Sequence, residues 1–536
     1  MRCFPSSDTF RSLTCDHRED ERTLAVPVVT RLLADQLTPA IAYRRLVVGD
    51  DRTAPSFLLE SVEQGARQSR YSILSTEPMI EVLARDHDVT VRDRRTGNER
   101  TERRDDPLMV MRELSSEFHE LIMQEHEGVL PACITSGWVG YASYDTVRYA
   151  EPDKLSFETA PHDDRNLPDM HFAFYDGVVV FDHAENTVLV IRLALLEPGG
   201  DVDEAYKRAA DALARTVGML QTHSRHLPAG SVDDIPADSE FGGRVRSNLT
   251  RETHGEMVER AQEYIRAGDI FQVVIGQRFE MREQADPFDV YRALRAINPS
   301  PYMTYLQAEG VILIASSPEI LCRVRREDEG APWVVTNRPL AGTRRRGRDE
   351  AEDLALEQEL LADAKERAEH VMLVDLGRND VGRVAVPKSV EMPALMHVER
   401  YSHVMHISST VTGELREGLG PWDALRAALP VGTISGAPKI RAMQIIDELE
   451  PIRRGPYGGG IGYVSIDGQM DIALALRTIV VPTALRDGET WAYHMQASGG
   501  IVAESVAEDE YVETVNKAKA MERAVAAGAT IFQDPA

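Results

Sequence analysis

Cysteine is scarce in this 536-residue sequence, which contains four cysteines and no CxxC pair. Their wide spacing favours neither a disulfide framework nor a zinc module. Long hydrophobic runs are also lacking, because the most apolar stretch, Val188–Leu196, is short and contains Arg192. A membrane span needs about 20 apolar residues. The N-terminus has no apolar signal-peptide region, so we expect a cytoplasmic protein.

Positive charge is in deficit, since 60 Lys and Arg residues face 87 Asp and Glu residues and give a formal charge of −27. Such a surface repels nucleic acid and anionic lipid. An anionic ligand would therefore need a local cationic pocket. The content of 43% hydrophobic and 27% charged residues is that of an ordinary globular protein, which excludes collagen, coiled coil and wholesale disorder.

The hydrophobic pattern divides the chain into four parts. Residues 1–22 are polar and without periodicity, so we expect a loose extension. Residues 23–222 are mostly strand-like, and residues 223–247 are rich in Gly, Ser, Asp and Pro, which is typical of a linker. Residues 248–530 mix strands and helices without strict alternation. This pattern favours an α+β architecture over a doubly wound parallel sheet.

Periodicity predicts individual elements in both halves of the chain. Strands are expected over 56–59, 71–74, 176–182, 187–193, 273–278 and 311–315, with a hairpin turn at 183–186. Helices are expected over 202–220, 253–267, 354–376 and 508–527. In the long helix predicted over 354–376, the buried stripe would consist of Leu361, Ala364, Ala368, Val371 and Met372.

Two pairs of glutamates stand three residues apart within these helices, Glu366 with Glu369 and Glu510 with Glu513. Residues at i and i+3 lie on nearly the same side of a helix, so each pair can direct both carboxylates one way. Two such pairs could enclose one hard cation, and Mg²⁺ typically takes one or two carboxylates together with waters and substrate oxygens. Each pair could equally be a solvated helix face, with Glu513 and Lys517 forming an i,i+4 ion pair. For either pair alone, the solvated face is the better interpretation.

Three other motifs indicate chemistry less directly. The glycine-rich loop Gly432–Lys439 lacks the GxxxxGK[ST] spacing, which argues against a nucleotide site. The basic run Arg338–Arg346 could be an anion site or a solvated face. His403 and His406 form an isolated HxxH pair, which favours a core or hydrogen-bonding role over a zinc site. Taken alone, these features indicate an α+β protein that could use Mg²⁺ and act on an anion.

Taken in order, the motifs resemble those of the chorismate-utilising enzymes, and within that family those of the large subunits of anthranilate synthases. The resemblance covers residues 24–530. The matching strings are Leu58–Ser61, Gln68–Ser72, Gly140–Asp145, Phe271–Val274, Pro299–Met303, Ser317–Glu319, Pro339–Thr343, Lys365–His370, Asp375–Asp380, Gly432–Lys439 and Gln496–Val502. It implies antiparallel sheets in a sandwich flanked by helices, with a β-rich regulatory domain over 23–222 and a chorismate-binding catalytic domain over 248–530.

The resemblance also implies a reaction. Chorismate and ammonia would give 2-amino-2-deoxyisochorismate, from which pyruvate is eliminated to leave anthranilate. Mg²⁺ would link the ring carboxylate to Glu369 and Glu513, with Glu366 and Glu510 behind them through water. Glu319 would protonate the C4 hydroxyl that leaves the ring.

Further residues of the site follow from the same resemblance. Gln272, His406 and Thr433 would line the catalytic centre. Tyr457 and Arg477 would clamp the enolpyruvyl carboxylate, the arginine through a two-pronged ion pair. Backbone N–H groups at 342–343 and 498–500 would hold the other carboxylate. The full set of implied substrate contacts is Gly342, Thr343, Tyr457, Arg477, Ser498, Gly499, Gly500 and Lys517.

Two positions discriminate within the family. Relatives that add water to chorismate carry a lysine base where this sequence has Gln272, and ammonia needs no such base. Aminodeoxychorismate synthases that use a covalent lysine carry it where this sequence has Ala341. Both positions favour amination. Ser498 departs from the family pattern, in which many relatives have glycine, but a serine still offers its N–H.

The first half of the chain resembles the regulatory domain of the same family. A tryptophan site for feedback inhibition would consist of Glu60, Ser61, Pro301, Tyr302 and Met303. Periodicity alone would instead make Leu58 and Leu59 part of a buried strand. No cysteine stands in a nucleophile turn with a downstream His and Glu, so ammonia would come from a separate glutamine amidotransferase subunit in a hetero-oligomer.

Two other functions remain open from the sequence. One is another chorismate enzyme, an aminodeoxychorismate or isochorismate synthase. The other is a non-catalytic protein that senses tryptophan, against which the acid, metal and clamp positions argue.

Overall fold

The computed structural model describes most of the chain. The described residues are 2–17, 19–47, 52–61, 70–122, 126, 128–222, 227–236, 244–328, 330–401, 404–429 and 431–532. Residues 68–69 of a matching string, His403 of the HxxH pair and parts of the predicted linker lie outside this set. Within it, no helix has the length and apolar character needed to cross a bilayer.

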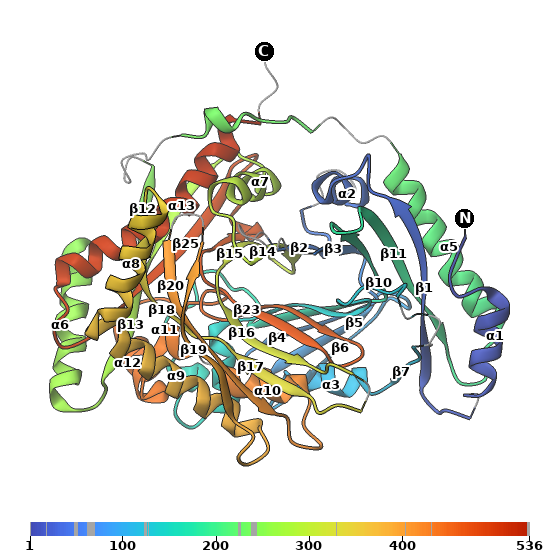
Figure 1. Ribbon diagram of the computed structural model, residues 1–536, viewed down its shortest axis with the longest axis horizontal. Helices are drawn as coiled ribbons and strands as arrows, with labels where there is room; N and C mark the ends of the chain where they lie inside the picture. Colours follow the sequence, from blue (N-terminus) through green and yellow to red (C-terminus); the bar gives the residue numbers. More distant parts are fainter. Residues whose placement is uncertain are drawn as a thin grey trace.

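The helices are distributed along the whole chain (Figure 1). They are α1 (Ser7–Cys15), α2 (Pro39–Leu46), α3 (Met109–Ser115), α4 (Val147–Ala150), α5 (Val202–Gln221), α6 (Arg251–Ala267), α7 (Pro287–Ile297), α8 (Glu350–Ala362), α9 (Ala364–Val384), α10 (Pro421–Ala428), α11 (Gly432–Ser435), α12 (Lys439–Leu449) and α13 (Ala507–Thr530). Short 3₁₀ turns are η2 (Tyr144–Thr146), η3 (Phe157–Thr159), η4 (Val232–Asp234) and η5 (Thr483–Leu485).

One large sheet, sheet A, contains strands from both ends of the chain. In spatial order its strands are β12 (Val245–Ser247), β13 (Gln272–Glu283), β25 (Trp491–Ile501), β24 (Thr478–Pro482), β15 (Val311–Ser317), β14 (Tyr302–Ala308), β2 (Ser56–Glu60), β3 (Tyr71–Thr76), β10 (Gly177–Asp182), β11 (Thr187–Leu196), β1 (Thr23–Leu33) and β7 (Phe118–Glu120), and β21 (Gly436–Ala437) pairs with β13. Its described pairings are antiparallel except that β1 and β7 run parallel.

The second large sheet, sheet B, is antiparallel in its described strand pairs. Its strands in order are β18 (Leu340–Arg345), β20 (Val404–Glu414), β17 (Val334–Asn337), β16 (Ile320–Arg325), β23 (Met470–Leu474), β22 (Gly460–Ser465), β8 (Gly137–Ala142), β9 (Met170–Tyr175), β4 (Ile80–Arg85), β5 (Asp88–Asp93) and β6 (Asn98–Arg103), and β19 (Glu391–Arg400) pairs with β20. Both sheets therefore join the two halves of the chain.

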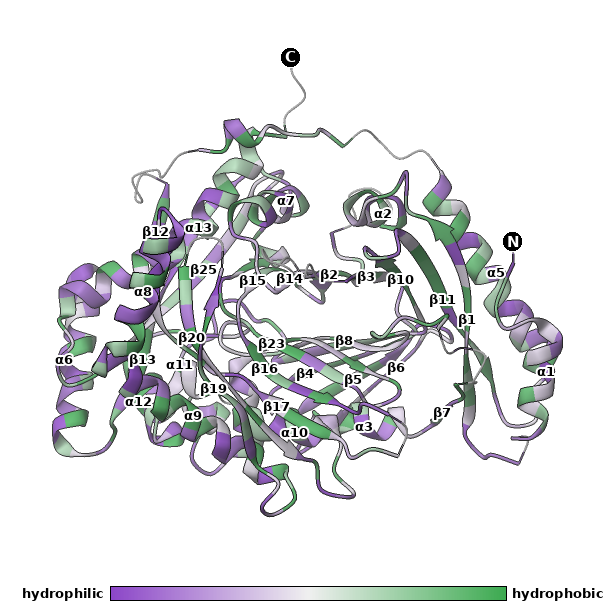
Figure 2. Cartoon of the chain, viewed as in Figure 1, coloured by the Kyte–Doolittle hydropathy of each residue, from purple (hydrophilic) through white to green (hydrophobic). Residues whose placement is uncertain are grey.

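The core has three main layers of apolar side chains. One cluster fills the space between the sheets, where Phe57 and Val180 of sheet A meet Val139 and Tyr141 of sheet B. A second lies between sheet A and helices α2, α5, α7 and α13, and a third between sheet B and helices α3, α9 and α10. Strand β11, which belongs to this core, is hydrophobic along much of its length in Figure 2. The predicted α+β sandwich flanked by helices is confirmed.

The predicted elements match the structure with two corrections. The hairpin is confirmed, since Asp182 pairs with Thr187 across its turn. The single helix expected over 354–376 is wrong, because Asp363 ends α8 and caps α9, accepting hydrogen bonds from the backbone N–H groups of Lys365 and Glu366. The predicted stripe is wrong as well, because the side chain of Val371 is 48% exposed.

The second correction concerns the expected loose extension over residues 1–22. Residues 7–15 form helix α1, capped by Ser6, whose side chain accepts a hydrogen bond from the N–H of Thr9. Phe10 is buried against Tyr206 of α5. Phe4 adds an antiparallel bridge to Val29 of β1. This segment is therefore packed onto the β-rich half of the molecule.

Candidate active site

Both glutamate pairs lie in the first two turns of their helices. Glu366 and Glu369 begin α9, and Glu510 and Glu513 begin α13. A helix N-terminus carries partial positive charge, which stabilises nearby carboxylates and partly offsets their mutual repulsion. Helix formation alone thus accounts for two anionic pairs held with fixed direction.

One glutamate of each pair approaches strand β25. A Cβ atom added to Gly499 would lie 2.9 Å from Oε2 of Glu510, and one added to Gly500 would lie 3.8 Å from Oε1 of Glu369. Glycine at these positions therefore leaves room for carboxylates from both helices. A shared cation site for the four glutamates stays a prediction.

Two of the four carboxylates have a positive partner, Glu366 in Arg344 and Glu513 in Lys517. Burial and the charge of Glu513 raise the pKa of Glu510, and burial and the charge of Glu369 raise the pKa of Glu366. Within the described chain, Oε2 of Glu510 is buried without a hydrogen-bond partner. Arg344 approaches Glu366 at 3.3 Å. This oxygen-only set fits a hard cation.

The described residues contain no group of three or more His, Cys, Asp or Glu side chains that could hold a metal ion by themselves. Mg²⁺ binding by these glutamates therefore stays a prediction, in which water and substrate would supply the remaining oxygens.

Gln272 is buried at the start of β13 and lies beside the same carboxylates. Its amide Nε2 donates to Oε1 of Glu369 at 3.1 Å. A neutral amide cannot deprotonate a nucleophile, but it can fix the orientation of the carboxylate that it contacts. Gln272 therefore positions Glu369.

Glu319 is 3% exposed, directly before β16. Its Oε1 accepts a hydrogen bond from Oγ1 of Thr433 at 2.9 Å. Burial raises the pKa of Glu319 to about 8, and the Thr433 hydrogen bond opposes this rise. The carboxyl is consequently protonated at pH 7 and can donate a proton, which is the property required of a general acid.

Arg477 occupies an unusual position for a cation. Its φ of +46° places a non-glycine residue in the left-handed region, where strain is associated with functional sites. Burial lowers the pKa of its guanidinium, and Tyr401, not a described carboxylate, is the group that opposes this shift. A desolvated guanidinium is suited to binding an anion such as a carboxylate.

Tyr457 lies near the same strand as the glycines. It is buried, and its hydroxyl donates to Oγ of Ser498 at 3.1 Å. Burial raises the pKa of Tyr457 to about 12, so the phenol stays protonated. Lys517 contacts Glu513 at 2.6 Å and donates to the backbone oxygen of Ser498 at 2.8 Å. The i,i+4 ion pair between Glu513 and Lys517 that the sequence predicted is therefore present, and the same lysine also binds strand β25 at Ser498.

The register of β25 determines which N–H groups near residue 499 are free. Gly499 lies opposite Ile275 of β13. The N–H of Gly276 and the backbone oxygen of Val274 point away from β25, because the first donates to Glu450 and the second accepts from Arg454. Backbone groups alternate between the two edges of a strand, so the Gly499 N–H takes part in the ladder. On the other edge, β24 pairs only with Met495 and His494. Among residues 498–500, only the N–H groups of Ser498 and Gly500 therefore lie outside this ladder, and that of Ser498 is directed at the Tyr457 hydroxyl.

His406 is a neutral imidazole at pH 7, because burial and the nearby Arg477 lower its pKa to about 4. Its Nδ1 lies 3.0 Å from the backbone oxygen of Gly342 and 3.0 Å from Oγ1 of Thr343. A carbonyl can only accept, so Nδ1 carries the proton and Nε2 keeps its lone pair. His406 thus offers a proton acceptor at Nε2.

Some of these groups line a cavity of about 650 Å³, whereas others are not part of its lining, namely Gln272, Glu319, Gly342, Glu366, Glu369, Thr433, Tyr457, Ser498, Gly499, Gly500 and Glu510. Thr343, His406, Arg477, Glu513 and Lys517 lie on its surface, and Pro318, next to the acid Glu319, does as well. Tyr401, which no sequence motif predicted, also lines this cavity and packs edge-on against His406. Its proximity to His406 in the sequence was the only available signal.

A second cavity, of about 390 Å³, is formed where the two halves of the chain meet. Its lining includes all five residues predicted for the inhibitor, Glu60, Ser61, Pro301, Tyr302 and Met303. They come together because β2 pairs directly with β14, with Glu60 opposite Met303. Leu58 is fully buried, as expected for a core strand, whereas Glu60 and Ser61 of the same segment line the cavity. Arg295 pairs with Glu60 at 3.0 Å.

The remaining sequence motifs have structural explanations. The basic run Arg338–Arg346 is largely neutralised: Arg344 contacts Glu359 and Asp363, and Arg346 contacts Asp353. It is therefore no free anion site. Lys439 of the glycine-rich loop is buried against Asp380 and does not face a phosphate pocket.

Comparisons with known proteins give a consistent result. Residues 57–523 match the family described as chorismate binding enzyme. Anthranilate synthase alpha subunit 1 of Oryza sativa subsp. japonica is 51% identical over 525 residues, which cover 95% of this chain and 89% of the relative. Anthranilate synthase component 1 of Thermus thermophilus is 46% identical over 504 residues, covering 93% and 97%. The crystal structure of anthranilate synthase component I from Streptococcus pneumoniae has a TM-score of 0.68 and 34% identity, covering 92% and 99%. With its match spanning both sheets and both cavities, this chain belongs to the chorismate binding enzyme family.

Proposed function

We propose that the chain is the large subunit of an anthranilate synthase, which converts chorismate and ammonia into anthranilate and pyruvate. The names of relatives about half identical to this chain support the activity. The observation that carries amination over hydration is Gln272, an amide that contacts Glu369 where a water-adding relative would carry a base. Ammonia is a nucleophile without such help.

The cation in this proposal is Mg²⁺, held by Glu369 and Glu513 with Glu366 and Glu510 behind them. The unpartnered Oε2 of Glu510 and the carboxylates on both sides of the glycine strand support this site. When bound, Mg²⁺ would offset the charge of a dianionic substrate and draw electron density toward the ring carboxylate.

The protein's own groups account for binding and proton transfer. Arg477 and Tyr457 would hold the enolpyruvyl carboxylate, and the N–H groups of Ser498 and Gly500 would face the other carboxylate. Glu319 would protonate the C4 hydroxyl, which leaves as water while ammonia bonds to C2. Loss of the C2 proton and cleavage of the ether bond then release pyruvate and leave the aromatic ring. Neutral His406 offers Nε2 for a proton within the same cavity.

Turnover tests this proposal directly. We expect chorismate, ammonium and Mg²⁺ to give a fluorescent product with the mass of anthranilate, together with one equivalent of pyruvate. Isochorismate or aminodeoxychorismate as the product would assign the chain to another chorismate activity. No product, combined with tight tryptophan binding, would favour a sensor.

The ammonia source in this proposal is a glutamine amidotransferase subunit. The relatives named as components or alpha subunits support a partner of this kind. We expect the isolated chain to use ammonium and to be inactive with glutamine. Adding the amidotransferase subunit should restore the glutamine-dependent reaction in a hetero-oligomer.

Replacing Ala341 by lysine tests how the substrate lies. Ala341 stands beside Gly342 on β18, half-buried. An amine there would compete with ammonia for the ring, so we expect slower anthranilate production and a covalent adduct detectable by mass spectrometry. A normal rate without adduct would mean that position 341 does not face the substrate.

Feedback inhibition by tryptophan is proposed for the 390 Å³ cavity. Its wall is continuous with that of the larger cavity: Pro318 lines both, and residues 298–300 line one while residues 301–304 line the other. An effector can alter turnover only through contacts that differ between two states of the protein. A segment shared by both cavities offers such contacts.

Ser61→Phe tests this assignment. The phenyl group would fill the cavity, so the concentration of tryptophan needed for half inhibition should rise at least tenfold, while turnover without inhibitor stays within about twofold of wild type. The measurement is a tryptophan titration at fixed chorismate. Equal inhibition of both proteins would move the regulatory site elsewhere.

A further inference from the structure

The segment 432–438 carries Thr433, the hydroxyl that bonds to Glu319. Helix α11 in this segment is a single turn, which is too short to be stable by itself. The following strand β21 forms only two pairs with β13, Gln272 with Ala437 and Val273 with Gly436. The position of Thr433 must therefore be determined by contacts from outside the segment.

The first such contact is a buried ion pair, Arg454 with Glu450, whose residues are 2% and 4% exposed. The guanidinium donates to the backbone oxygen of Ile434 at 2.6 Å and to that of Val274 at 2.7 Å. Its Nε donates to Glu450 at 2.8 Å, and Glu450 also accepts the backbone N–H of Gly276 at 2.9 Å. One side chain thus ties the loop next to Thr433 to strand β13.

The second contact lies at the other end of the segment. Lys439, the first residue of α12, pairs with Asp380 of α9, and the two are 8% and 4% exposed. Helix α9 is the helix that begins with Glu366 and Glu369. The Lys439 ion pair therefore fastens the loop to the helix that carries half of the acidic cluster.

Buried ion pairs are poor devices for stability, because desolvation of both charges cancels much of their attraction. The two ion pairs that hold the segment 432–438 therefore need an explanation other than stability. Arg454 fixes the orientation of two backbone carbonyl groups at once, because its donors are held in a planar fork. An arrangement of this kind fixes backbone atoms relative to one another.

We propose that Arg454–Glu450 and Lys439–Asp380 are positioning residues for the reaction, which hold Thr433 in hydrogen-bonding distance of the acid Glu319. This inference rests on the proposed function. None of the four touches the 650 Å³ cavity in the described structure. In this proposal their effect on the rate passes through the Thr433 hydroxyl, because displacing a reacting group by about 1 Å can cost a hundredfold in rate.

The groups around Glu319 make this testable through pH. Besides burial, its pKa is influenced by the Thr433 hydroxyl from α11 and the backbone N–H of Leu340 from β18, with no charged side chain of the described chain contributing. The Thr433 hydrogen bond lowers the pKa. Losing it should therefore shift the alkaline limb of the kcat profile to higher pH.

The experiment compares Arg454→Lys, Thr433→Val and the double variant in the wild-type background, with chorismate, ammonium and Mg²⁺. Lysine keeps the charge beside Glu450 but cannot span both carbonyls. We expect Arg454→Lys to lower kcat at least tenfold, to change KM for chorismate less than threefold, and to raise the apparent alkaline pKa as Thr433→Val does. The double variant should show no additional shift, because both changes remove one hydrogen bond.

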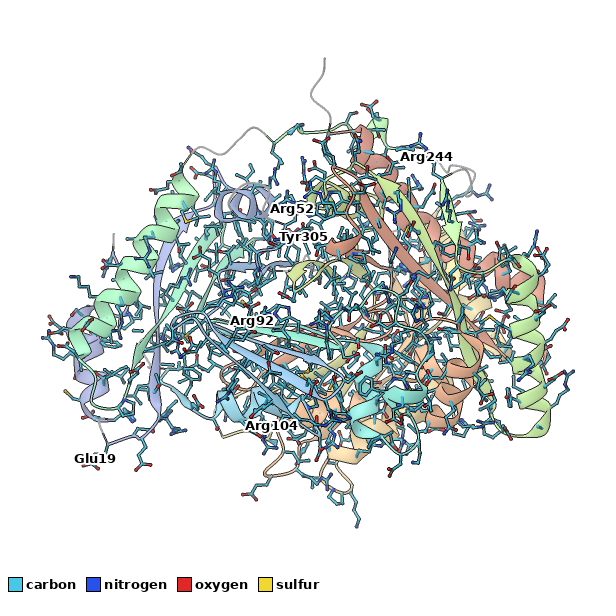
Figure 3. All side chains as sticks on the ribbon, turned by 180° about the vertical axis from the view of Figure 1, so that it is seen from behind. Glu19, Arg52, Arg92, Arg104, Arg244 and Tyr305 are labelled. Carbon is cyan, nitrogen blue, oxygen red and sulfur yellow. The ribbon has the colours of Figure 1, made fainter. Side chains whose placement is uncertain are left out.

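Arg52→Lys is the matched control. Arg52 is likewise a buried arginine, paired with Asp286, and lies beside Tyr305 (Figure 3). The Arg52→Lys variant should lower the Tm as much as Arg454→Lys while leaving kcat and the pH profile unchanged. If Arg454→Lys behaves like Arg52→Lys, the pair is only structural and the proposal is wrong.

A second variant covers the case in which Arg454→Lys does not fold. Lys439→Met combined with Asp380→Asn removes both charges, a change that proteins often tolerate. It should fold, with kcat reduced at least tenfold and the alkaline limb raised. An unchanged limb overturns the proposal. A wild-type protein without anthranilate synthesis, or without a limb that Glu319→Gln removes, would instead contradict the proposed function.

Discussion

Glu319→Gln is expected to reduce kcat by about 10²–10⁴-fold, because a glutamine cannot donate the proton that the leaving hydroxyl requires. The wild-type enzyme should show an alkaline limb with an apparent pKa of about 8, where the buried carboxyl ionises. Activity is lost as the pH rises through this value. The residual activity of the variant should lack the limb altogether. The measurement is kcat against pH from 6 to 9.5 for both proteins.

The same substitution should leave the protein as stable or more stable. The pKa of Glu319 is raised to about 8 in the folded protein, from 4.5 as its ordinary value. Between these values the folded state binds more protons than the unfolded state, so the free energy of unfolding falls as the pH rises. Glutamine never ionises. At pH 8 we therefore expect the Tm of Glu319→Gln to equal or exceed that of wild type, with little difference near pH 4.5.

Glu120 provides a control with the same electrostatics at another place. Burial raises its pKa to about 8 as well, assisted by the charge of Asp467 and opposed by a hydrogen bond from Thr135. Glu120→Gln should change stability with pH in the same direction. It should leave kcat and its alkaline limb unaffected. A loss of the limb in this variant, or its persistence in Glu319→Gln, would show that Glu319 is not the acid.

Much of the fold could be predicted from local patterns. Alternation in residues 176–193 predicts the hairpin, and its turn is confirmed by the pairing of Asp182 with Thr187. The long helix failed because helical periodicity continues across Asp363, whereas a side chain that caps the next helix can end one helix and begin another at the same residue. The pattern of apolar residues does not distinguish an aspartate that separates two helices from an aspartate inside one continuous helix.

The site could be predicted only as far as its residue types are informative. The glutamate pairs indicate a cation, but Arg477 could be named only from the family resemblance, because its strained backbone and buried guanidinium are visible only in the structure. The sheet register likewise decides which N–H groups are free, and no single-strand pattern contains it. The cavity of about 390 Å³ depends on pairing between β2 and β14, whose residues are more than 240 positions apart in the sequence. Contacts of that kind follow from the whole fold.

Glu369→Gln and Glu513→Gln should each abolish Mg²⁺-dependent turnover, with losses of about a thousandfold or more. Each replacement keeps the shape of the side chain and removes the anionic oxygen that a hard cation prefers. The fold should be retained. Glu513 is about half exposed, and Glu369 is not fully buried, so neither supports the core. Removing a charge from either repelling pair should even favour the folded state slightly.

Thermal unfolding with increasing Mg²⁺ provides a readout that does not depend on turnover. A ligand that binds only the folded state stabilises it by RT ln(1 + [L]/Kd), so wild type in the presence of chorismate should gain several degrees in Tm. The two variants should gain little. Glu508→Gln is the matched control, because Glu508 lies in the first turn of the same helix but pairs with Arg251 at the surface. It should respond to Mg²⁺ as wild type does. Near-normal activity of Glu369→Gln or Glu513→Gln at limiting Mg²⁺, or a full Tm response, would rule out these carboxylates as the metal site.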